Sequence, residues 1–102
     1  MIAATVAAIT ANISFPFAEK HLCYDGVEKL APYYHGHDVK FAYNDNPGQG
    51  HVWLIVDGQP IDTYYGIVYG SEWTHPQHIY NSFAELEQGV IEITGIKDPR
   101  CA

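Results

Sequence analysis

The chain has few basic residues. Only 5 Lys and Arg stand against 12 Asp and Glu, which gives a formal net charge of −7 with the six histidines neutral. Binding to a phosphate backbone releases counterions only where basic side chains cluster, and a chain of this charge repels polyanions. We therefore expect neither a nucleic-acid partner nor binding to anionic membrane surfaces.

Cysteine is equally sparse. Cys23 and Cys101 are the two cysteines in 102 residues, and neither belongs to a CxxC pair. Two cysteines cannot form a disulfide-rich scaffold, so the composition favours a reduced, cytoplasmic setting, although a single Cys23–Cys101 bridge stays open.

The N-terminal segment lacks the basic residues of a signal peptide. No Lys or Arg precedes Lys20, and the apolar run over residues 1–13 is shorter than the roughly 20 residues that a membrane span requires. Its Ile and Val residues recur at spacings of four, three and four, which predicts a helix. We expect one domain over residues 1–102, with a core supplied by the aromatic 14% of the chain.

The rest of the pattern predicts a second helix and then a sheet. The second helix is expected from about Glu19 or Leu22 to Tyr34. The following elements are expected in order: a strand over 38–43, a loop over 44–50, a strand over 51–56, a hairpin turn at Asp57-Gly58, a return strand over 59–65 with a bulge at Gly66 and a continuation over 67–69, a loop over 70–81, a helix from a Ser82 capping box to Gly89, and a strand over 90–96. This order predicts an α+β domain with N-terminal helices packed on a mainly antiparallel sheet.

Cys23, His51 and Asp62 are the candidate catalytic residues. A thiol nucleophile needs a base that makes it a thiolate, and the base needs a third group that fixes its tautomer. If Asp57-Gly58 is a two-residue turn, Asp62 becomes the diagonal neighbour of His51 on the same face of the hairpin. A slip of one residue would place the two side chains on opposite faces. Cys23 is expected near the start of the second helix, where exposed N–H groups lower a thiol pKa and can hold an oxyanion.

Two segments resemble the core of transglutaminase-like proteins within the papain-like cysteine-protease fold: residues 21–30, which contain Cys23, and residues 50–62, which contain His51 and Asp62. In that superfamily a helix begins at the nucleophilic Cys, a strand carries His with an aromatic residue two positions later, and a hairpin returns the Asp. The resemblance implies acyl transfer through a thioester, followed by hydrolysis or transfer to an amine, on a peptide or protein substrate and without a cofactor. The Gln that papain-type enzymes place shortly before the Cys is absent, which leaves Asn12, Lys20 or His21 as candidate oxyanion donors.

Three aromatic residues are candidates for substrate binding. Trp53 shares the face of His51 and could shield the His51–Asp62 contact from water. Tyr64 lies across from His51 in the expected register, and Tyr24 follows the candidate nucleophile. Because a chain of 102 residues has little left to enclose a substrate, the site would be an open groove, and a partner or a second copy in a homo-oligomer could supply specificity.

Two other interpretations stand beside the catalytic one. A catalytically inactive papain-like-fold domain could bind a protein partner through its acidic surface and its tyrosines. The His35-Gly36-His37 and His75-Pro76-Gln77-His78 segments suggest a metal site, but neither has the CxxC or HExxH context of a strong zinc pattern, so we expect exposed loop histidines and no metal.

Overall fold

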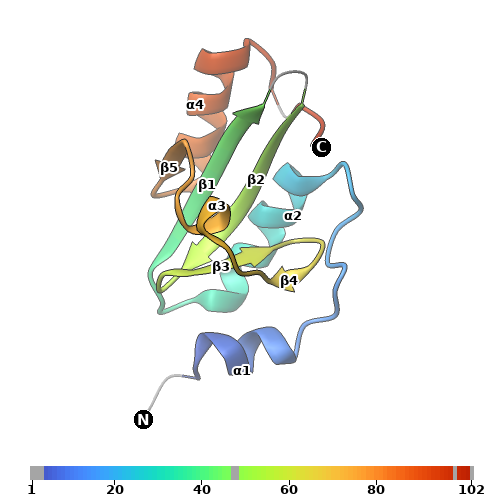
Figure 1. Cartoon of the computed structure of the whole chain (residues 1–102), viewed down its shortest axis with the longest axis vertical. Helices are drawn as coiled ribbons and strands as arrows, with labels where there is room; N and C mark the ends of the chain where they lie inside the picture. Colours follow the sequence, from blue (N-terminus) through green and yellow to red (C-terminus); the bar gives the residue numbers. More distant parts are fainter. Residues whose placement is uncertain (1–3, 47–48, 98, 102) are drawn as a thin grey trace.

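The computed structural model describes residues 4–46, 49–97 and 99–101. Its elements are, in chain order, α1 (Val6–Ala11), α2 (Cys23–Leu30), the 3₁₀ helix η1 (Ala31–Tyr34), β1 (Val39–Asn46), β2 (Gln49–Val56), β3 (Gln59–Asp62), β4 (Gly66–Ile67), α3 (Ser71–Thr74), β5 (His78–Tyr80) and α4 (Phe83–Thr94). The strands form one sheet in the order β4-β3-β2-β1-β5, with antiparallel neighbours, so the predicted α+β class is confirmed (Figure 1). Residues 1–3 of the expected first helix and the Pro47-Gly48 pair of the expected loop lie outside the described residues.

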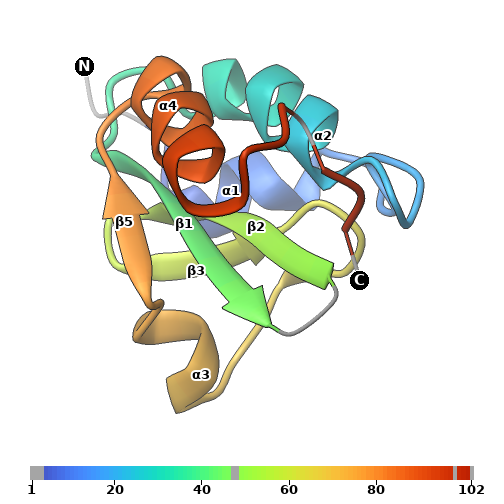
Figure 2. The same ribbon diagram turned by 90° about the horizontal axis from the view of Figure 1, so that it is seen from above.

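The helices are divided unequally between the two faces of the sheet. Figure 2 shows α1, α2 and α4 on one face and the short α3 on the other. The main core lies under α2 and α4, where alternate residues of β2 meet apolar residues of both helices. Each fully buried Val, Leu or Ile stabilises the fold by about 1.5–3 kcal/mol. The fully buried Val, Leu and Ile side chains are Val27, Leu30, Val52, Leu54, Val56, Ile61, Leu86 and Val90.

The hairpin between β2 and β3 has the predicted register. Asp57 and Gly58 have φ angles of 49° and 83°, and both are positive, as a two-residue type I′ turn requires. Val56 accordingly pairs with Gln59. This register brings Asp62, the last residue of β3, back beside the middle of β2, where it meets His51.

The chain turns away sooner than expected after β3. The strand ends at Asp62, whose Oδ2 accepts hydrogen bonds from the N–H groups of Tyr64 and Tyr65 at 2.8 and 2.9 Å. The expected return strand over 59–65 is therefore too long, and Tyr64 does not pair with His51. Gly66 begins β4, which pairs antiparallel with β3 rather than continuing it.

Two expected loops contain regular structure. β1 and β2 remain paired as far as Asn46 and Gln49, so most of the expected loop over 44–50 is strand. The expected loop over 70–81 contains α3 and β5, and β5 pairs with β1 through Phe41 and Tyr80.

The C-terminal region is one long helix instead of a short helix and a strand. Ser82 is confirmed as the N-cap, because its Oγ accepts a hydrogen bond from the Glu85 N–H at 3.1 Å, but the Glu85 carboxylate accepts from the Ser82 hydroxyl and not from its backbone N–H as in a full capping box. The helix continues through Gly89, whose missing side chain lets Tyr80 approach, and it ends at Gly95 with a φ of 74°. The expected strand over 90–96 is wrong, because the buried residues Leu86, Gly89 and Val90 follow the helical spacing.

The start of the second helix matters most for the site. α2 begins at Cys23, within the expected range, and η1 follows it directly and ends at Tyr34, the expected last residue of this helix.

No helix in residues 4–46, 49–97 or 99–101 is long and apolar enough to cross a membrane.

Candidate functional site

The three predicted residues meet where α2 begins and the hairpin ends. Cys23 is the first residue of α2, His51 lies in β2, and Asp62 closes β3. The His51 Nε2 lies 2.7 Å from the Asp62 Oδ1, and a ring nitrogen of His51 lies within 4.8 Å of the Cys23 Sγ. The expected proximity of these side chains is therefore confirmed. Because Asp62 engages Nε2, Nδ1 is the nitrogen left for a thiol or a metal ion.

Asp62 is a buried carboxylate that accepts hydrogen bonds from three groups. Its side chain is 1% exposed; its Oδ1 meets His51, and its Oδ2 accepts from the N–H groups of Tyr64 and Tyr65. Burial alone would raise the pKa of Asp62, but the hydrogen bond and charge of His51, together with both N–H groups, hold this pKa below its usual value. An ionised Asp62 accepts the Nε2–H of His51 and so fixes the tautomer with a free Nδ1.

Two tryptophans surround the His51 ring. The Trp53 ring stacks on it with centroids 5.8 Å apart, and the edge of Trp73 packs against it at the same distance. The Trp53 Nε1–H donates to the Trp73 carbonyl oxygen at 2.9 Å, which fixes the pair. With Asn44 and Glu72, they line a cavity of about 200 Å³ beside His51. Sequence reasoning missed Trp73 because its segment was expected to be an irregular loop.

A disulfide joins Cys23 to Cys101. The composition had favoured reduced cysteines, and the structure corrects this expectation. The Cys101 backbone is held on both sides: its carbonyl oxygen lies 2.7 Å from the His21 Nδ1, and the residue forms a parallel bridge with Gly50. The available signal was the cysteine count, which had left this pairing open.

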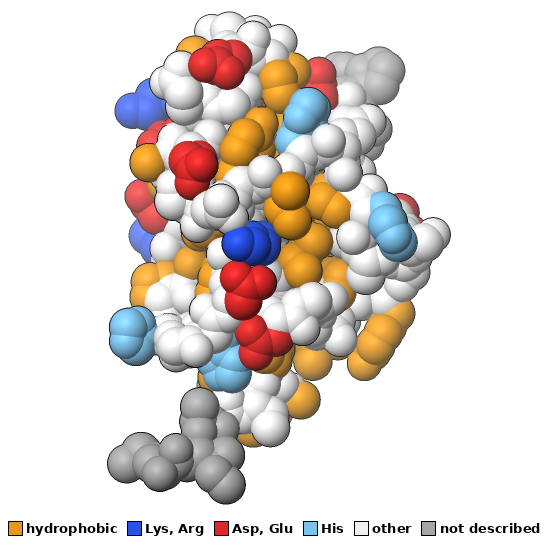
Figure 3. All heavy atoms as spheres, turned by 90° about the vertical axis from the view of Figure 1, so that its left-hand side faces the viewer, with side chains coloured by type: hydrophobic (Ala, Val, Ile, Leu, Met, Phe, Trp, Pro, Cys, Tyr) orange, Lys and Arg blue, Asp and Glu red, His pale blue; other side chains and the backbone are white. Residues whose placement is uncertain are grey.

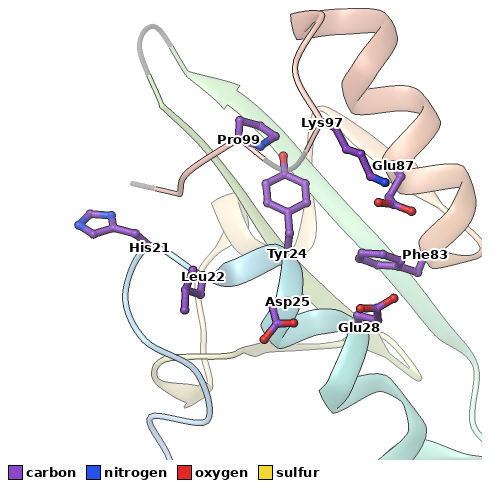
Figure 4. A pocket seen from close by; sticks show the side chains of 9 residues that line it. All are labelled: His21, Leu22, Tyr24, Asp25, Glu28, Phe83, Glu87, Lys97 and Pro99. Carbon is purple, nitrogen blue, oxygen red and sulfur yellow. The ribbon is translucent and has the colours of Figure 1, made fainter.

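A second cavity, of about 370 Å³, flanks the start of α2 (Figure 4). It lies between α2, α4 and the C-terminal segment, and Tyr24 points from α2 toward that segment. Three carboxylates and one lysine make it an acidic cavity. Its lining residues are His21, Leu22, Tyr24, Asp25, Glu28, Phe83, Glu87, Lys97 and Pro99.

The candidate oxyanion donors differ in position. The Asn12 Nδ2 donates to the Ala8 carbonyl oxygen at the end of α1, whereas the His21 ring engages the carbonyl of Cys101. The N-cap of α2, Leu22, makes no side-chain hydrogen bond to the first turn of this helix. Because the His21 ring is already engaged and no side chain caps α2, the first N–H groups of this helix are the candidate donors for an oxyanion at Cys23.

Three of the four histidines in these segments have structural partners, and His78 lies in β5, stacked between Tyr43 and Tyr80, rather than in the exposed loop that was expected. The His37 Nδ1 lies 2.6 Å from the Asp57 Oδ2, and its Nε2 donates to the Ala4 carbonyl oxygen. The His75 Nδ1 lies 3.0 Å from the Ser71 carbonyl oxygen. Within the described parts of the chain, the cluster able to hold a metal is a different one, formed by Cys23, His51 and Cys101.

Comparison with known proteins adds no relative: no protein-family model matches the chain, and no curated protein or solved structure matches it significantly. The candidate function therefore rests on the fold and on the site itself.

Proposed function

We propose that the protein is a small cysteine hydrolase or acyltransferase of the peptidase, amidase or transglutaminase-like kind. Cys23 is the nucleophile, His51 the base and acid, and Asp62 the group that orients His51. The observation that carries the proposal is the position of the His51 ring. Its Nε2 lies 2.7 Å from the Asp62 Oδ1, and a ring nitrogen lies within 4.8 Å of the Cys23 Sγ. A papain-like core is proposed with it, because a helix starts at the Cys and an antiparallel hairpin supplies the His and the Asp.

The reaction requires the reduced protein. The Cys23 thiol gives its proton to His51, and the thiolate attacks the carbonyl carbon of a peptide or amide. First-turn N–H groups of α2 hold the oxygen that becomes negative. The intermediate expels an amine that takes the proton from His51, and a thioester remains. Water or a second amine then attacks the thioester, its proton passes to His51, and the Cys23 thiolate leaves.

Reduction also frees the nucleophile. The sulfur of Cys23 is unavailable while it is bonded to Cys101, and Cys23 is 2% exposed. A dithiol reductant would free both thiols, so we place the active form in a reducing compartment such as the cytoplasm. The cavities that Tyr24 and Trp53 line flank the freed thiol and His51, which suits an extended peptide or protein segment.

Two single-cysteine variants test the proposal. Cys101→Ser leaves Cys23 as the free thiol, and Cys23→Ser leaves Cys101 as the matched control. Both are alkylated with iodoacetamide at about pH 5 to 8 in the presence of a chelator. We expect Cys23 to react at least about ten-fold faster than Cys101 at about pH 6, because both sulfurs lie near His51 but only Cys23 also lies at the start of α2, where N–H groups stabilise its thiolate. In the Cys101→Ser background, His51→Ala should bring the rate down to that of the control.

An ordinary thiol profile for Cys23, or a rate unaffected by His51→Ala, would overturn the catalytic proposal. The alternative is then a non-catalytic domain of the same fold that binds a protein partner. On the face shown in Figure 3, acidic side chains are spread among hydrophobic ones. Tyr65 and Tyr69 are exposed and would be the residues to mutate in a binding assay.

A further inference from the structure

We propose that Cys23, His51 and Cys101 of the reduced protein bind one Zn²⁺ ion, with a water in the fourth position. Among residues 4–46, 49–97 and 99–101, these three side chains form the group whose metal-binding atoms all lie within 4.8 Å of one another. Two thiolates and one imidazole are ligands that zinc prefers, and three protein ligands with one open position are typical of reactive zinc sites.

The geometry needs only a small adjustment. Tetrahedral zinc with Zn–S bonds of about 2.3 Å and a Zn–N bond of about 2.0–2.1 Å places its ligand atoms about 3.5–3.8 Å apart. The Cα atoms of Cys23 and Cys101 are 5.9 Å apart, so both sulfurs can reach one ion once the bond between them opens. The backbone contacts of Cys101 with His21 and Gly50 do not involve its sulfur, and they keep this thiol beside Cys23 after reduction.

Asp62 supplies the support that a zinc-binding histidine requires. Metal-binding histidines almost always donate their other N–H to a carboxylate or carbonyl, which fixes the ring and makes it a better ligand. The His51 Nε2 is engaged by Asp62 at 2.7 Å, which leaves the Nδ1 lone pair for the ion. The His51 side chain is 23% exposed and gives the ion a route from solvent, whereas both cysteines are buried.

The chemistry balances in two steps. A dithiol reductant gives two electrons and two protons to the disulfide and becomes a disulfide itself. The two thiols then release two protons as they bind the ion. Zinc binding goes beyond the proposed catalytic function and opposes it, because the ion occupies the Cys23 thiolate and the His51 nitrogen that the reaction needs.

The test is a metal titration of the whole reduced chain, stripped with a chelator and exchanged into metal-free buffer. Zn²⁺ is titrated against a chromophoric chelator, and the stoichiometry is read by native mass spectrometry. Co²⁺ serves as a spectroscopic probe. We expect one Zn²⁺ per chain and, with Co²⁺, a thiolate-to-metal charge-transfer band.

The variants identify the ligands. Asp62→Asn should weaken binding by about 10–100-fold, the usual loss when a supporting group is removed, and Cys101→Ser should weaken it by more. His35→Ala removes an exposed histidine outside the cluster and should bind like the wild type. Absence of one-to-one binding, or equal affinity of Cys101→Ser and the wild type, would overturn the proposal.

A protection experiment covers a variant that fails to fold. One equivalent of Zn²⁺ should block alkylation of both cysteines in the reduced wild type, and alkylation of either one at an unchanged rate would overturn the proposal. The catalytic proposal is decided separately, by the reactivity of Cys23 in metal-free Cys101→Ser. Failure of either experiment therefore leaves the other proposal standing.

Discussion

Cys101→Ser should lower the stability of the oxidised protein strongly, although it replaces the last residue that the structure describes. The disulfide links residues 78 positions apart, so its main effect is on the unfolded chain, which loses conformational freedom when the loop is closed. For a loop of this length the chain-entropy relation gives about 4.5 kcal/mol at 25 °C. With an unfolding entropy of about 2.1 cal/mol/K per residue, the melting temperature should fall by about 20 °C.

Urea unfolding measures this loss, because Trp53 is buried and reports the transition by its fluorescence. Oxidised wild type, reduced wild type and Cys101→Ser are compared in the presence of a chelator. Reduced wild type and Cys101→Ser should unfold at nearly the same urea concentration, well below the oxidised protein. Cys23→Ser is the matched control, since it breaks the same bond from the other end.

Equal midpoints for the oxidised wild type and Cys101→Ser would refute the reasoning. A Cys23→Ser variant as stable as the oxidised wild type would refute it as well, because removing either cysteine opens the same loop and should lower the urea midpoint equally. The dependence of the unfolding free energy on urea concentration should be steeper in the variants, since an unfolded chain without the cross-link exposes more surface.

Three further predictions follow from individual contacts. The pKa of Asp62 is lowered on folding, so its contribution to stability is present above the unfolded pKa and is lost as the pH falls. Asp62→Asn should cost about 1.5–3 kcal/mol at neutral pH, the usual worth of hydrogen bonds to a charged group, and should flatten the loss of stability toward about pH 3, measured by urea unfolding. Gly89→Ala should destabilise α4 by about 1–3 kcal/mol in thermal melts despite the better helix propensity of Ala, because the new Cβ would meet the Tyr80 ring, and a more stable variant would contradict this packing. The hydrogen bond to Asp57 raises the pKa of His37, so NMR titration should show His37 losing its proton above the usual pH for histidine, and Asp57→Asn should abolish that difference.

The β2–β3 hairpin and the His51–Asp62 pair could be predicted because their signals are local. The alternation in β2 and the Asp57-Gly58 pair lie within a few residues of each other, and together they define the hairpin register. The turn after Asp62 could not be predicted in the same way, because it depends on a carboxylate that captures two N–H groups further along the chain. Tyr64 was therefore assigned to the wrong position.

The C-terminal region was mispredicted because distant contacts decide its structure. By composition, a strand would suit Val90, Ile91 and Ile93. In the structure, however, Val90 and Leu86 lie one helical turn apart on α4 and both pack in the core. The sequence predicts that Gly89 ends the helix, but in the structure Gly89 lies inside the helix and leaves room for the Tyr80 ring. The pairing of Cys23 with Cys101 is likewise a contact between the two ends of the fold.

The Asp57-Gly58 turn controls the candidate site from the opposite end of the hairpin. The Asp57 carboxylate accepts the Asp38 N–H at 2.8 Å and lies 2.6 Å from the His37 Nδ1, so the turn is tied to the start of β1 as well as to its own strands. Because side chains alternate between the faces of a strand, one extra residue in this turn would move Asp62 to the face opposite His51. The group that orients His51 therefore depends on a turn that touches neither Cys23 nor the disulfide.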